Sequence, residues 1–173
     1  MQPMHKLSCY KHLLQTDLVA LSALKAFQDC LDFSFITAVY KYDTYHITST
    51  QRSPEEIQHA LKNCLLFSNP IKETLLFDIP KHKAKNQLYI EVNEKYPPKK
   101  TALEEHLKLL INDKALQLTQ SRLWHLQVQD DYPLNEETIL KQLVYSSSST
   151  QGLLANPILE EAKLIKAHHA TLT

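Results

Sequence analysis

Two five-residue stretches of this sequence are nearly identical: Asn69-Pro70-Ile71-Lys72-Glu73 and Asn156-Pro157-Ile158-Leu159-Glu160. They differ only at their fourth residue and lie 87 positions apart, since 158 − 71 = 87. An Asn-Pro pair removes a backbone donor and disfavours helical geometry before the proline, so each stretch predicts the end of a helical segment. Apolar residues follow at 75–77 and 164–165, and they indicate β-strands. The sequence therefore predicts the same helix, turn and strand twice.

Agreement between the two halves extends upstream of these turns. Tyr45-His46-Ile47 matches Trp124-His125-Leu126 at an offset of 79 (125 − 46), and Glu55 matches Glu136 at an offset of 81 (136 − 55). The rising offsets require two short insertions, the longer one within residues 146–151, and both fall where chains usually tolerate them. Agreement in the same order across three elements favours a duplication over chance similarity between two helix–strand units.

Each half shows the same order of helix and strand signals. Ser53 and Thr101 are each followed three residues later by glutamate, which is the signature of a helix N-terminus. In the first half we expect strands at 7–13, 36–42, 45–48 and 75–77, and helices over 17–31 and from Ser53, with a turn at 43–44. In the second half we expect strands at 87–92, 116–119, 123–128 and 164–165, and helices from Thr101 and Asn135.

These signals predict an α+β fold made of two tandem β-α-β-β-α-β units, with antiparallel sheets and helices on one face. The first repeat, which is the more divergent, covers residues 1–80, and the second covers residues 87–173 and includes a C-terminal tail. Residues 81–86 form a polar and basic linker. A single copy of this length buries limited apolar area, so we expect the two repeats to pack as a pseudo-dimer.

The composition excludes several classes of function. Gly152 is the one glycine in 173 residues, where average usage would give about a dozen. A Walker A loop, a dinucleotide-binding fingerprint and a nucleophile elbow all need more glycine than this chain contains. Lysine plus arginine equals aspartate plus glutamate at 19 each, so no net charge draws the chain to nucleic acid or to an anionic membrane.

The cysteines favour a reducing compartment. Cys9, Cys30 and Cys64 are odd in number and lack C-x-x-C spacing, so we expect them to be small core residues of a cytoplasmic protein. The N-terminus shows no apolar run typical of a signal peptide. The most apolar stretch, residues 18–31, is interrupted by charged and polar side chains, so the sequence predicts no membrane span.

The residues around the second turn resemble a known family. Leu153–Glu160 reads Leu-Leu-Ala-Asn-Pro-Ile-Leu-Glu, which is similar to the C-terminal signature of PurS, the small subunit of phosphoribosylformylglycinamidine synthase. Residues 86–167 have the length and element order of one such subunit, whereas the first half joins the resemblance through the internal repeat. A long single-chain form of the enzyme carries an N-terminal domain that looks like two fused copies. The signature residues are Asn69, Pro70, Ile71, Leu154, Ala155, Asn156, Pro157 and Ile158.

The resemblance implies a non-catalytic role in de novo purine biosynthesis. In that family one subunit hydrolyses glutamine, a second uses ATP to activate the substrate amide, and the small subunit organises both for ammonia transfer. The chain would then be an accessory subunit of a glutamine-dependent carbon–nitrogen ligase, with no catalytic residue and no cofactor of its own. Its partners would be the synthetase and glutaminase subunits, and self-association stays open. The alternative is a small-molecule-binding regulatory module of ACT-like or ferredoxin-like fold.

Other chemistry finds weaker support in the residues. His46 and His125 occupy equivalent positions in the two halves, and His168-His169 lie in the tail, but adjacent or strand-borne histidines alone do not make a metal site. Tyr40 and Tyr42 share one strand face, yet no segment carries the basic and aromatic signature of an RNA-recognition fold. We therefore expect no metal and no nucleic acid.

Overall fold

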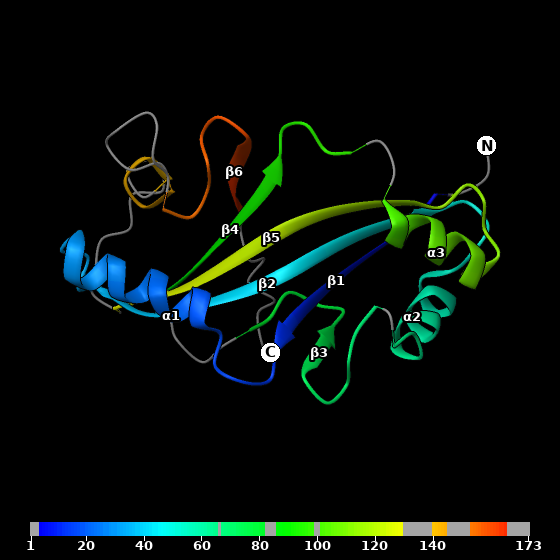
Figure 1. The fold of residues 1–173 in the computed structure, drawn as a ribbon, viewed down its shortest axis with the longest axis horizontal. Helices are drawn as coiled ribbons and strands as arrows, with labels where there is room; N and C mark the ends of the chain where they lie inside the picture. Colours follow the sequence, from blue (N-terminus) through cyan, green and yellow to red (C-terminus); the bar gives the residue numbers. More distant parts are fainter. Residues whose placement is uncertain are drawn as a thin grey trace, which may run out of the picture. The chain divides into compact units, whose positions relative to one another are not determined.

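The computed structural model describes residues 4–65, 67–81, 86–98, 101–129, 140–144 and 153–165. The expected linker residues 82–85, the helix start at Asn135, the insertion at 146–151, Gly152 and the tail histidines lie outside the described residues. The described elements are, in chain order, β1 (His5–Leu13), α1 (Leu18–Lys25), η1 (Ala26–Cys30), β2 (Ile36–Ser49), α2 (Pro54–Lys62), β3 (Glu73–Leu76), β4 (Asn86–Glu94), α3 (Ala102–Ile111), β5 (Gln117–Val128), η2 (Leu140–Val144) and β6 (Glu160–Ile165) (Figure 1). The two η segments are π-helical.

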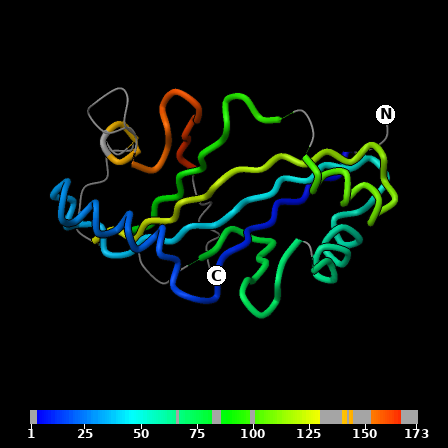
Figure 2. The backbone as a smooth tube through the Cα atoms, in the orientation of Figure 1, coloured from blue at the N-terminus to red at the C-terminus, as the bar shows by residue number. Residues whose placement is uncertain are grey.

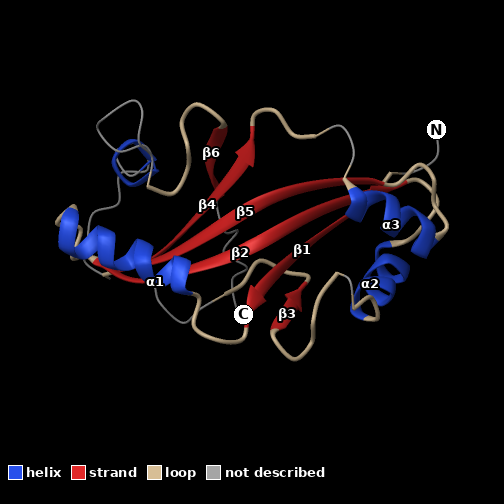
Figure 3. Ribbon diagram, in the orientation of Figure 1, coloured by secondary structure: helices blue, strands red, loops and turns tan. Residues whose placement is uncertain are grey.

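The six described strands form one open antiparallel sheet in the order β3-β1-β2-β5-β4-β6. Strand β1 pairs with β2 on one side, where Leu7 lies opposite Ile47, and with β3 on the other side. Figure 3 shows the strands together with the α-helices α1, α2 and α3. The fold class is therefore α+β, as the sequence predicts.

The prediction of two strands separated by a turn at residues 43–44 is wrong, because β2 runs without a break from Ile36 to Ser49. Asp43 and Thr44 pair with Lys11 and Tyr10 of β1, so they lie inside the ladder and not in a turn. Thr44 is β-branched and buried, which suits a strand interior. Strand β5 likewise joins the expected strands 116–119 and 123–128. In Figure 2 the tube does not reverse direction along either strand, and because each is one strand, the β-α-β-β-α-β description does not hold.

The chain divides into two compact units. Unit 1 comprises residues 1–15, 42–80 and 97–121, and unit 2 comprises residues 16–41, 81–96 and 122–173. Each unit therefore contains segments from both halves of the sequence, and neither coincides with the repeats expected at 1–80 and 87–173. The physical reason is that β2 and β5 are long enough to begin in one unit and end in the other.

Unit 1 has its own apolar core beneath α2 and α3. Helix α2 comes from the first half of the sequence, and its start at Ser53 is a capping box, as expected. Helix α3 comes from the second half, and its Thr101 side chain accepts a hydrogen bond from the amide of Glu104. The buried core residues of this unit are Cys9, Tyr45, Ile47, Ile57, Leu61, Cys64, Phe67, Leu107, Ile111, Leu116 and Leu118.

Unit 2 has a second core, which is also shared between the two sequence halves. Helix α1 and η1, from the first half, contribute residues that include the fully buried Phe27. Along β5, the even-numbered residues Trp124, Leu126 and Val128 face this core, whereas Leu118 of the same strand faces the core of unit 1. The other buried core residues are Ala20, Ala23, Ile36, Val39, Leu88, Ile90, Val92, Leu143, Val144, Leu154 and Ala155.

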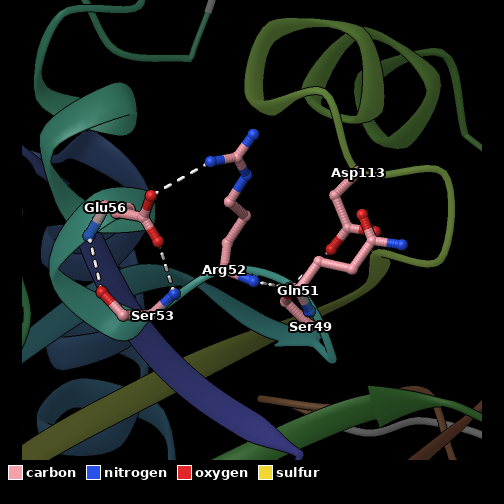
Figure 4. A network of polar contacts seen from close by, with 6 residues as sticks. All are labelled: Ser49, Gln51, Arg52, Ser53, Glu56 and Asp113. Atoms are coloured by element: carbon pink, nitrogen blue, oxygen red, sulfur yellow. Dashed lines mark hydrogen bonds and ion pairs between the residues drawn. The ribbon is translucent and has the colours of Figure 1, made fainter.

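A polar network in unit 1 joins the end of β2 to Asp113, which lies two residues beyond the end of α3 (Figure 4). The Ser49 hydroxyl donates to Asp113 Oδ2 at 2.5 Å and accepts from the amides of Gln51 and Arg52 at 3.1 and 2.9 Å. Asp113 Oδ1 accepts from the amide of Ala115 at 2.8 Å. A fully buried carboxylate without such donors would be costly. This network therefore fixes a second-half residue onto a first-half strand.

The shared core of unit 1 gives a testable expectation. Leu107 of α3 is fully buried, so Leu107→Ala removes core contacts and is expected to lower the free energy of unfolding by about 2–5 kcal/mol. Amides of α2, from the other sequence half, should also exchange faster with solvent. Hydrogen exchange and chemical denaturation measure both effects. Leu109→Ala on the same helix is the control, because Leu109 is exposed and its loss should change neither.

Candidate interaction surface at two equivalent turns

The first Asn-Pro turn, in unit 1, is closed by four hydrogen bonds. The Asn69 carbonyl accepts from the amides of Lys72 at 2.9 Å and Glu73 at 2.8 Å. The Asn69 side chain accepts from the amide of Ile71 at 3.1 Å, and Glu73 Oε2 accepts from the Asn69 amide at 2.9 Å. Both ends of the five-residue stretch are thereby fixed to each other.

The second Asn-Pro turn, in unit 2, has the same four hydrogen bonds between the equivalent donors and acceptors. The Asn156 carbonyl accepts from the amides of Leu159 at 3.1 Å and Glu160 at 2.7 Å. The Asn156 side chain accepts from the amide of Ile158 at 3.0 Å, and Glu160 Oε2 accepts from the Asn156 amide at 2.7 Å. Because all four bonds recur at an offset of 87, the sequence repeat is also a repeat of local structure.

The residue types in this motif explain why it forms. Asparagine, like aspartate, has a short side chain whose oxygen accepts from the backbone amide two residues on. Proline comes next, where its missing amide leaves no donor to satisfy. The glutamate in fifth place then reaches back to the asparagine amide. Glu73 and Glu160 are therefore part of the motif, although neither is among the predicted signature residues. Their identity in both stretches was the signal that could have revealed them.

The strands that flank the turns are equivalent as well. Leu13 of β1 lies opposite Glu73 of β3, and Glu94 of β4 lies opposite Glu160 of β6. The register of the β1–β3 pair becomes that of the β4–β6 pair when 81 is added to the residue numbers of β1 (94 − 13) and 87 to those of β3 (160 − 73). These values agree with two of the three offsets in the sequence.

A backbone hydrogen bond beyond each register follows the same rule. The amide of Leu14 donates to the Lys72 carbonyl, and the amide of Lys95 donates to the Leu159 carbonyl, both at 2.8 Å. Each turn is thus held against the residue that follows the first strand of its half. The Lys95 ammonium adds a bond of 2.6 Å to the Pro157 carbonyl in the second turn.

Both turns present apolar side chains to solvent. Ile71 is 83% exposed and Ile158 is 61% exposed, although the two occupy equivalent positions and are large aliphatic residues. Leu154 and Ala155 of the signature instead lie buried in the core of unit 2. We define the turn-1 surface by Leu13, Leu14 and Ile71, and the turn-2 surface by Tyr96, Ile158 and Leu159, all of which are exposed. Grouped exposed apolar residues are typical of interaction sites.

The glutamate of each motif also forms an ion pair, but with different partners. Glu73 Oε1 lies 3.6 Å from the Lys11 ammonium of β1, and Glu160 Oε1 pairs with Arg122 of β5. Lys11 is half-buried, and its contact with Tyr45, together with Glu73, raises its pKa although burial acts to lower it. The backbone of the motif has therefore been kept while its ionic surroundings differ.

His46 in unit 1 has hydrogen-bonding neighbours of its own. Its Nδ1 lies 2.9 Å from the Ser8 hydroxyl, and its Nε2 lies 3.4 Å from the Ser121 hydroxyl. His125 in unit 2 is instead fully buried in an aromatic stack. Among the described residues, no group of three histidine, cysteine or acidic side chains could hold a metal ion.

The aromatic stack in unit 2 consists of three rings. The centroid of the His125 ring lies 5.3 Å from that of Tyr40 and 4.5 Å from that of Tyr89, and the three planes are close to parallel. Burial raises the pKa of Tyr89. Tyr40 therefore serves packing against a histidine in this unit.

The cysteines differ in their exposure. Cys9 and Cys64 are buried in the core of unit 1, as expected, and burial raises the pKa of Cys9 to about 12, so its thiol is not ionised at neutral pH. Cys30 is exposed, which makes the expected core position wrong. Cys30 is the last residue of η1. The π-helical turn has more residues than an α-helical turn, so the spacing of inward-facing residues in α1 does not continue through η1.

Comparison with protein-family models, with curated proteins and with solved structures finds no match to this chain. Within the described part of the chain, every helix is too short or too polar to cross a membrane. The assignment of function therefore rests on the turns themselves and on the resemblance of the second one.

The second turn gives a testable expectation for stability. Asn156→Ala removes the acceptor for the Ile158 amide and is expected to lower the free energy of unfolding by about 1 kcal/mol, which is a fall of roughly 2–4 °C in Tm for a chain of this size. Asn69→Ala should have a similar effect in the first turn. Asn156→Ser, which keeps a weaker acceptor, should lie between. Thermal and chemical denaturation of the three variants checks the order, and an unchanged Asn156→Ala would contradict it.

Proposed function

We propose that this chain is a non-catalytic structural subunit of phosphoribosylformylglycinamidine synthase, acting in de novo purine biosynthesis in the cytoplasm. In this role it organises the ATP-dependent synthetase and the glutaminase subunit, so that ammonia released from glutamine reaches the synthetase. It corresponds to two fused copies of the small PurS subunit. The proposal builds on the fold and on the two Asn-Pro turns.

One observation carries this proposal. The stretch that resembles the PurS signature contains the second Asn-Pro turn, and the first half reproduces the four hydrogen bonds that close that turn at an offset of 87. The first half thus joins the resemblance through its backbone geometry as well as its sequence. A motif conserved within one chain at this level supports a duplication of the element that bears the family signature.

The strand order supports the same duplication. If β4, β5 and β6 are the second copies of β1, β2 and β3, the order β3-β1-β2-β5-β4-β6 reads the same from either end. Two identical three-stranded subunits whose second strands pair with each other would form one sheet with this same strand order. We infer that the two sequence halves form a pseudo-dimer, in which each half supplies a helix to the core mostly built by the other.

Expression of the chain as two pieces tests the pseudo-dimer. Residues 1–80 and 87–173 are expected to co-purify as a 1:1 complex when co-expressed, because the cores of both units need residues from each half. Leu107→Asp in the second piece should abolish the complex, whereas Leu109→Asp should leave it intact. The stoichiometry is measured by light scattering. Two pieces that fold separately as monomers would contradict the inference.

Reconstitution tests the role in ammonia transfer. Addition of this chain to the synthetase and glutaminase of the same organism should restore glutamine-dependent synthesis of formylglycinamidine ribonucleotide. Synthesis from free ammonium should need the chain far less, because ammonium bypasses the step that the chain organises. Product formation is measured with both nitrogen sources.

Two outcomes would contradict the proposed function. One is equal rates with and without the chain in both assays. The other is purification of the tagged chain from its host with a tightly bound small molecule and neither large subunit. That second result would support the regulatory module instead.

A further inference from the structure

We draw no further inference here: the strongest candidate, the exposed apolar side chains of the turn-1 and turn-2 surfaces, carries none, because nothing in the described part of the structure shows what covers them.

Discussion

The uninterrupted course of β2 and β5 is the constraint on which the rest of the structure depends. Each strand begins in one compact unit and ends in the other, so the chain cannot complete a core from consecutive residues. Helix α3 of the second half packs with α2 of the first half over one core, and α1 of the first half packs over the other. Without a turn in these strands, each half must give one helix to the other.

Local hydrogen bonds made part of the fold predictable from the sequence. The caps at Ser53 and Thr101 were found because a capping hydroxyl and the amide it accepts from lie within three residues. The Asn-Pro pairs predicted the ends of helical segments because proline lacks an amide and disfavours helical geometry in the residue before it. The break expected at 43–44 was wrong because pairing with β1, which is distant in sequence, outweighs the turn preference of aspartate. Which segments of the chain form each unit depends on pairing between strands that are distant in sequence. It could therefore not be predicted from patterns of consecutive residues.

The candidate site was predictable to the same extent. Asn69, Pro70 and Ile71 and their counterparts were predicted as a signature from the identity of the two stretches and from the resemblance of the second one to PurS. The carboxylates of Glu73 and Glu160 were missed because their role depends on a side chain that reaches back four residues. Exposure of Ile71 and Ile158 could not be predicted either, because a hydrophobic residue after Asn-Pro faces inward or outward according to how the turn meets the strand before it.

A comparison of equivalent side chains shows which features have been kept. Ser8 and Tyr89 are related by the offset of 81 (89 − 8), and each contacts the histidine at the equivalent place in its own unit. A hydroxyl–imidazole hydrogen bond in unit 1 thus corresponds to aromatic stacking in unit 2. The two halves thus keep the backbone hydrogen bonds of their turns, while the side chains around the equivalent histidines make different contacts.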